Sequence, residues 1–147
     1  GNTSTREWIN HPGAACIIPI MSDGRLALIK QYRYPVQSIM IELPAGKLDE
    51  GEEPEACAVR ELEEEIGYLA EKLTFVSKIH PAIGFANEEM WIFLAERLIE
   101  SQKRTDHDEF VELMPTFIED AVRMVWNGTI TDVKTIIGIL WAERLLS

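Results

Sequence analysis

The chain has 147 residues, of which 46% are hydrophobic and 27% charged, and its formal net charge at pH 7 is −11. This length suits a single folded domain, which we expect to cover residues 1–147. The negative charge argues against nucleic acid as a partner. No apolar run reaches the roughly 18 residues needed to span a membrane. A phosphorylated small molecule is compatible with the charge if divalent cations lie between the two sets of negative groups.

The two cysteines, Cys16 and Cys57, are far apart and neither belongs to a CxxC pair. We therefore expect two buried thiols in a reducing compartment, and not a disulfide or a metal pair. The N-terminus has no charged-then-apolar signal layout, so a cytoplasmic protein is expected. Because the sequence opens at Gly1 and not at a methionine, we expect a trimmed chain that lacks part of its natural N-terminus.

The first elements in chain order are predicted strands. Ala14–Met21 is an almost continuous apolar run, residues 22–24 signal a turn, and Arg25–Tyr32 alternates between apolar and polar residues. Together these segments predict a β-hairpin. Ile39–Leu43 predicts a further short strand that ends at Pro44, because proline has no N–H to donate to a sheet.

A helix is predicted after the segment Gly46–Glu53, whose acidic residues and glycines indicate a loop. Pro54 suits the first position of a helix, and Gly67 suits its C-terminal cap. Apolar residues recur between them at spacings of three and four, which predicts one buried face. The residues of this apolar stripe are Val59, Leu62 and Ile66.

The rest of the chain predicts three strands and two helices. The strands are Leu73–His80, Met90–Arg97 and a short segment that ends at Met114. The helices run from about Thr116 to Trp126 and from a cap at Thr131 or Asp132 to the end of the chain. Strands around a central helix, followed by C-terminal helices, predict the α+β class. We expect an α/β/α sandwich with a mixed β-sheet flanked by helices.

Three glutamates share one face of the predicted helix. Glu61, Glu64 and Glu65 stand at positions i, i+3 and i+4, where Cβ atoms lie roughly 5–6 Å apart. Like charges at this spacing destabilise a helix, so the cluster needs a bound cation or full exposure to water. Carboxylate oxygens favour Mg²⁺ or Mn²⁺, whereas zinc would call for His or Cys. Taken alone, such a cluster is more often a solvated acidic face.

The segment from Gly46 to Tyr68 resembles the Nudix box, G-x5-E-x7-R-E-U-x-E-E-x-G-U, in which U is a bulky apolar residue. Tyr68 departs from this pattern, because an aliphatic residue is usual there. The resemblance implies the Nudix fold, with a loop–helix–loop whose carboxylates hold divalent cations against the diphosphate of a substrate. All seven fixed residues are in register, namely Gly46, Glu52, Arg60, Glu61, Glu64, Glu65 and Gly67.

The resemblance also implies roles for individual residues. Glu61 and Glu65 are expected to be the main ligands of Mg²⁺, which Mn²⁺ can replace. Glu64 is expected to be a further or water-mediated ligand, and the carbonyl of Ala45 to join the set. The cations would neutralise the diphosphate, activate a water and stabilise the leaving phosphate. Structural roles within the box are implied for Gly46, Glu52, Arg60 and Gly67.

Outside the box, the chain resembles the branch of the family that hydrolyses ADP-ribose and other nucleoside diphosphate sugars. The matching stretches are His11–Ala14, Gln31–Arg33, Glu42–Leu48 and Lys134-Thr135. The resemblance implies that Arg33, Glu42 and Glu88 bind the substrate and that the protein is a homodimer. The products would be a nucleoside monophosphate and a sugar phosphate.

One residue departs from the pattern of that branch. A proline beyond the box usually marks it, but Ile83 stands at that position and the nearest proline is Pro81. GDP-mannose, or another nucleoside diphosphate sugar, therefore competes with ADP-ribose as the expected substrate.

The catalytic base of this branch usually comes from a late acidic loop and not from the box. Asp108 and Glu109, in the loop Thr105–Glu109, are the expected candidates. Two other functions stay open. One is a non-catalytic sensor that binds a nucleotide sugar, although such sensors often lose box carboxylates and this box is complete. The other is an enzyme of the same fold that acts on dinucleotides or nucleoside triphosphates.

Overall fold

The protein is described by a computed structural model that covers residues 1–102 and 110–147. Its strands form two sheets, one with the order β4-β1-β6-β5 and one with the order β3-β2-β7. The first sheet contains β1 (Ala14–Pro19), β4 (Ala45–Lys47), β5 (Tyr68–Ile79) and β6 (Met90–Glu100). The second contains β2 (Leu26–Arg33), β3 (Ser38–Glu42) and β7 (Val111–Thr116). The helices are α1 (Pro54–Ile66), α2 (Ile118–Trp126) and α3 (Val133–Leu146), with a short 3-10 helix η1 (Tyr34–Val36) after β2.

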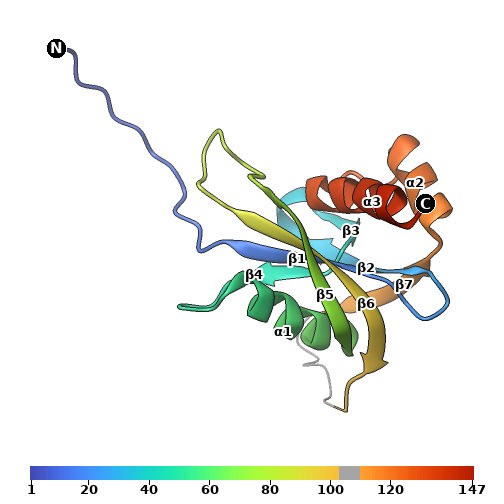
Figure 1. Cartoon of the computed structure of the whole chain (residues 1–147). Helices are drawn as coiled ribbons and strands as arrows, with labels where there is room; N and C mark the ends of the chain where they lie inside the picture. The colour runs from blue at the N-terminus through green and yellow to red at the C-terminus, as the bar shows by residue number, and fades with distance from the viewer. Residues whose placement is uncertain (103–109) are drawn as a thin grey trace.

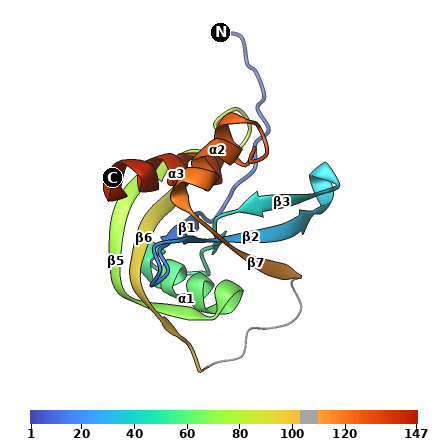
Figure 2. The same cartoon turned by 90° about the vertical axis from the view of Figure 1, so that its right-hand side faces the viewer.

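The sheets lie between helices, with α1 on one side and α2 and α3 on the other (Figures 1 and 2). Strand β1 is buried on both of its faces. Cys16 and Ile18 belong to the apolar cluster that contains residues of α2 and α3, whereas Ala15 and Ile17 belong to the cluster that contains residues of α1. The predicted α+β class, with a mixed sheet flanked by helices, is therefore confirmed, because β1 pairs parallel with β6 and antiparallel with β4.

Helix α1 begins and ends where the sequence predicts. Pro54 is its first residue, and Gly67 caps its C-terminus with φ 74°, a left-handed conformation that glycine adopts without strain. The predicted apolar stripe is partly wrong, because Val59 is 42% exposed. The buried face has a spacing of four residues and consists of Ala58, Leu62 and Ile66, with Cys57 beside them.

The predicted hairpin is wrong, because β1 and β2 lie in different sheets. A single isolated bridge, between Ile20 and Leu26, links the two segments. The two edges of β1 are already occupied by β4 and β6, so β2 pairs with β3 and β7 instead. The predicted loop Gly46–Glu53 is also partly wrong, since Ala45–Lys47 forms β4. Both errors concern which strands pair, and pairing depends on distant residues.

The two cysteines are buried free thiols, as predicted. Burial raises the pKa of the Cys16 thiol to about 12. Among the helices of residues 1–102 and 110–147, none is long and apolar enough to cross a bilayer.

Gly138 sets the distance between α3 and the sheet. A Cβ atom at this position would lie 2.3 Å from Leu43 Cδ1 and 3.3 Å from Ile18 Cγ1. We expect Gly138→Ala to lower the free energy of unfolding by about 1–3 kcal/mol, the usual cost of overpacking a core. Urea unfolding measures the free energy of unfolding of the wild-type and variant proteins. Gly84→Ala is the control, because its new methyl group meets open space. Equal stability of the two variants would contradict the close packing of α3.

Candidate active site

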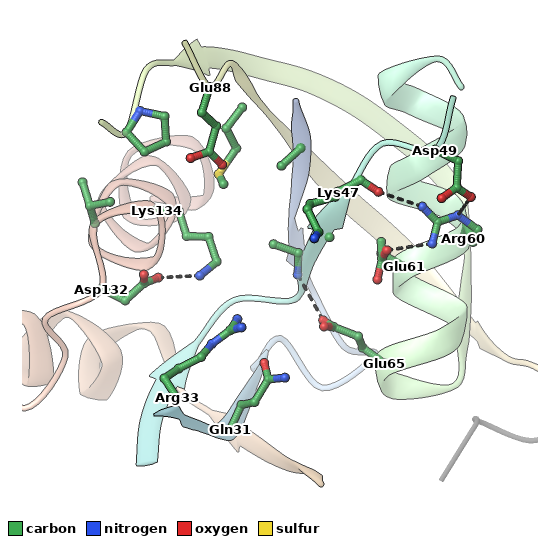
Figure 3. A pocket seen from close by; sticks show the side chains of 16 residues that line it. Gln31, Arg33, Lys47, Asp49, Arg60, Glu61, Glu65, Glu88, Asp132 and Lys134 are labelled. Atoms are coloured by element: carbon green, nitrogen blue, oxygen red, sulfur yellow. Dashed lines mark hydrogen bonds and ion pairs between the residues drawn. The ribbon is translucent and has the colours of Figure 1, made fainter. Parts of the chain in front are cut away.

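A pocket of about 570 Å³ opens between α1, β4 and the N-terminal end of α3. Figure 3 shows that its side chains fall into two groups. Glu61 and Glu65 reach in from α1, and Arg33 and Lys134 reach in from β2 and α3 on the other side. Glu88, from the segment between β5 and β6, also lines the pocket. We call Glu61 and Glu65 the acidic wall and Arg33 and Lys134 the basic wall; Lys47 and Arg60 lie beside the first and Asp132 beside the second.

The acidic wall is held against β4. Glu65 Oε2 accepts a hydrogen bond of 3.0 Å from the backbone N–H of Ala45. The carboxylate of Glu61 lies directly over Gly46, where a Cβ atom would be only 1.9 Å from Glu61 Oε1. The helix thus places both carboxylates beside the backbone of Ala45 and Gly46, and this close approach requires a glycine at position 46.

Arg60 ties this helix to the preceding loop. Its Nε and Nη2 donate to the two carboxylate oxygens of Glu52 at 2.8 and 2.9 Å, and Nη2 also donates to the carbonyl of Lys47 at 3.0 Å. Its Nη1 donates to Glu61 at 2.7 Å and to Glu64 at 3.1 Å. A bidentate pair of this kind fixes both side chains. Arg60 therefore screens the like charges of α1 and orients the Glu61 carboxylate.

The Glu52–Arg60 pair makes stability depend on pH. The hydrogen bonds from the Arg60 side chain and the Asp49 backbone hold the pKa of Glu52 at about 2, well below its ordinary value. A carboxyl group with a lowered folded-state pKa stabilises the fold above its unfolded-state pKa of about 4.3. That contribution is lost as the pH falls towards 2.

We therefore expect the free energy of unfolding to fall more steeply between pH 5 and pH 3 in the wild-type protein than in Glu52→Gln. Urea unfolding at several pH values measures the two slopes. Glu55→Gln, at an exposed position of the same helix, should keep the wild-type slope. Parallel curves for wild type and Glu52→Gln would contradict the prediction.

The basic wall rests on a buried carboxylate. Arg33 Nε and Nη2 donate to Glu42 Oε2 and Oε1, each at 2.8 Å, and Lys134 Nζ donates to the same Oε1 at 2.6 Å. Glu42 is only 2% exposed, so it lies behind the wall and not in the pocket. Lys134 Nζ also donates to Asp132 at 2.9 Å, and Asp132 caps α3 by accepting from the backbone N–H of Thr135.

Glu88 is placed near a histidine. The Nε2 atom of His11 lies 3.8 Å from Glu88 Oε1, and its Nδ1 accepts from the backbone N–H of Gly13 at 3.0 Å. With Nδ1 acting as an acceptor, the neutral ring carries its proton on Nε2, the atom nearer Glu88. His11 thus lies beside the Glu88 carboxylate without a direct hydrogen bond to it.

The acidic wall suits a hard divalent cation that keeps part of its water shell. Within residues 1–102 and 110–147, no three Asp, Glu, His or Cys side chains converge to hold a metal on their own. Mg²⁺ does not need such a cage, because it is commonly bound by one or two carboxylates together with waters and substrate phosphates. Glu61 and Glu65, which both line the pocket, fit that requirement.

The structure brings most of the predicted site residues together. Seven of them line the pocket, namely Arg33, Ala45, Gly46, Arg60, Glu61, Glu65 and Glu88. Glu64 does not line it, and its side chain is 54% exposed. Glu42 and Glu52 support pocket residues from behind through Arg33 and Arg60. The candidate bases Asp108 and Glu109 lie outside the described residues.

Lys134 and Asp132 line the pocket, although the sequence assigns neither of them to the site and predicts Asp132 only as a candidate helix cap. The signal for Lys134 is its place in the first turn of a largely apolar helix, beside the Asp132 cap. A lysine there is unfavourable, because the N-terminus of a helix carries partial positive charge.

Comparisons with known proteins agree with this arrangement. Residues 10–127 match the NUDIX domain. The chain is 43% identical to the ADP-ribose pyrophosphatase of Bacillus subtilis (strain 168), over 97% of this chain and 78% of that protein. It is 33% identical to the GDP-mannose pyrophosphatase of Yersinia pestis (strain Pestoides F), over 89% of this chain and 70% of that protein. A crystal structure of an ADP compounds hydrolase superposes with a TM-score of 0.82 at 25% identity, covering 91% of this chain and 72% of that one. The chain therefore belongs to the Nudix family.

Proposed function

We propose that this protein hydrolyses the diphosphate bond of ADP-ribose or a related nucleoside diphosphate sugar, giving a nucleoside monophosphate and a sugar phosphate. One observation carries the proposal: a single pocket sets Glu61 and Glu65 opposite Arg33 and Lys134. A diphosphate fits between these walls if cations cover the acidic side, because the phosphates then face those cations on one side and the Arg33 guanidinium on the other. The ADP-ribose and GDP-mannose pyrophosphatases among the relatives support the same class of substrate.

Glu61 and Glu65, with the carbonyl of Ala45, would hold the divalent ions, and Glu64 would contribute through a water. We propose Mg²⁺, for which Mn²⁺ can substitute, since hard carboxylate oxygens prefer these ions. Bound there, the ions would neutralise the phosphates and lower the pKa of an attacking water. Glu65 keeps its orientation through the Ala45 N–H, and Glu61 through Arg60.

Arg33 would bind the diphosphate from the opposite side. Its Nε and Nη2 are paired with Glu42, and this leaves the Nη1 side of the guanidinium outside the pair. An arginine held in this way presents a fixed fork to a phosphate. Glu42 would therefore contribute to substrate binding through Arg33, and Glu88 by direct contact. Asp108 and Glu109 are proposed as catalytic bases from their place in the sequence.

A panel of substrates tests the function. ADP-ribose, GDP-mannose, UDP-glucose, NADH, a diadenosine polyphosphate and a dNTP are each incubated with Mg²⁺ and with Mn²⁺, and the release of nucleoside monophosphate is measured. We expect turnover of ADP-ribose or GDP-mannose to exceed that of the dNTP. Tight binding of one nucleotide sugar without any turnover would make the protein a sensor, and preferred turnover of the dNTP would overturn the substrate class.

We also propose that residues 1–147 fold as one domain and that the protein acts as a cytoplasmic homodimer. The two buried free thiols suit a reducing compartment. Several large apolar side chains are exposed, including Tyr34, Ile39 and Phe110, and a second subunit would cover such surface. Light scattering on the purified protein measures the mass. A monomeric mass of 16.7 kDa would contradict the dimer.

A further inference from the structure

Lys134 occupies a place that disfavours a cation in two ways. It is 7% exposed, so its ammonium group has lost most of its hydration. It also stands in the first turn of α3, where the unpaired backbone N–H groups carry partial positive charge. A lysine in such a place requires strong compensation from neighbouring carboxylates.

Two carboxylates supply this compensation. Nζ lies 2.6 Å from Glu42 Oε1 and 2.9 Å from Asp132 Oδ2. Burial lowers the pKa of Lys134, but Asp132 and Glu42 outweigh this effect and the pKa lies above its ordinary value. Lys134 is therefore charged in the folded protein and acts as a fixed positive group.

The connection to Arg33 runs through one oxygen atom. Glu42 Oε1 accepts from both Lys134 Nζ and Arg33 Nη2, while Oε2 accepts from Arg33 Nε. Lys134 therefore limits the rotation of the Glu42 carboxylate, and that carboxylate fixes the plane of the guanidinium. Asp132 holds Lys134 from the other side and is itself fixed as the cap of α3.

Resting on the function proposed above, we propose that Lys134 is a positioning residue for the diphosphate. It holds Glu42 so that Arg33 presents its Nη1 side to the pocket. Without Lys134, Arg33 would be the one cationic partner of the buried Glu42 among residues 1–102 and 110–147. The Glu42 carboxylate would then be free to rotate, and the guanidinium paired with it would turn away from the phosphate. The loss would fall on binding of the diphosphate more than on the chemical step.

Lys134→Met tests this proposal. We measure the Kd of inorganic pyrophosphate with Mg²⁺, and that of ADP-ribose in EDTA, where it is not hydrolysed, both by titration calorimetry. We expect both Kd values to rise about tenfold, which corresponds to about 1.4 kcal/mol. With Mg²⁺, we expect KM to rise by a similar factor while kcat changes less than about twofold. Lys72→Met removes an ion pair with Glu96 on the surface and should leave both constants unchanged.

A double-mutant cycle separates positioning from direct contact. In an Arg33→Gln background, Lys134→Met should weaken binding by less than about twofold further, because its effect passes through Arg33. A repeated tenfold loss would mean that Lys134 binds the substrate itself, and would overturn the positioning role. Unchanged Kd and KM, with only a lower melting temperature, would make Lys134 merely structural and would also overturn it.

The outcomes also distinguish this proposal from the proposed function. If the wild-type protein turns over nucleotide sugars and Lys134→Met behaves like Lys72→Met, only the positioning role fails. If the wild-type protein turns over none of them but binds pyrophosphate more tightly than Lys134→Met does, the enzymatic function fails and the positioning role stands. If the wild-type protein binds neither probe and turns over none of the nucleotide sugars, both fail.

Discussion

Replacing Glu65 by glutamine is expected to lower kcat by about 10²–10³-fold while leaving the fold intact. The substitution removes the negative charge that would hold a divalent ion, and loss of one charged or hydrogen-bonding group from a transition-state site has effects of this size. The fold should survive, because the glutamine carbonyl can still accept the hydrogen bond from the backbone N–H of Ala45.

The measurement pairs activity with metal binding. Steady-state kinetics on ADP-ribose or GDP-mannose give kcat, and titration with Mn²⁺, followed by electron paramagnetic resonance, gives the metal affinity. Glu55→Gln is the matched control, because it makes the same change at an exposed position of α1 that does not line the pocket. Near-wild-type turnover and Mn²⁺ affinity in Glu65→Gln would show that the cations do not bind on this helix.

How much of the fold the sequence predicts depends on how local each signal is. The first residue of α1 and its C-terminal cap are predicted correctly, because the effects of Pro54 and Gly67 are confined to the turn of helix in which each stands. The cap of α3 is predicted to within one residue, since Thr131 and Asp132 are both candidates and Asp132 is the cap. The pairing of β1 with β4 and β6 escapes prediction, since it depends on partners far along the chain. A short apolar run before a turn therefore looks like one arm of a hairpin even when its partners lie elsewhere.

The candidate site divides in the same way. Glu61 and Glu65 share a face of one helix, so their spacing alone brings them together. The basic wall joins Glu42 to Lys134, which are 92 residues apart in the sequence. Residue spacing does not predict a contact over that separation, because the contact forms only when α3 packs against β3. The acidic wall can thus be predicted from the sequence, whereas the contacts that support the basic wall cannot.

Gly46→Ala is expected to disable the acidic wall without changing any charged residue. The backbone at position 46 accepts an alanine, since its φ lies outside the left-handed region. The new Cβ would lie 1.9 Å from Glu61 Oε1 and 2.0 Å from Glu61 Cδ, so the Glu61 carboxylate must move away. Only the end of a side chain has to give way, and the fold should therefore be kept.

The displaced carboxylate cannot return to its place beside Arg60 Nη1, because the new methyl group occupies that place. We expect the Kd of Mn²⁺ to rise about 10–100-fold, the range seen when the orientation of a metal ligand is disturbed. The value of kcat should fall with it, while the melting temperature stays close to that of Gly84→Ala, in which the new methyl group meets open space. If Gly46→Ala binds Mn²⁺ and turns over substrate like the wild-type protein, the Glu61 carboxylate does not hold a metal where it lies over Gly46. Gly46→Ala removes no charged group. A loss of Mn²⁺ affinity and of kcat would therefore come from the changed position of Glu61 and not from the loss of its charge.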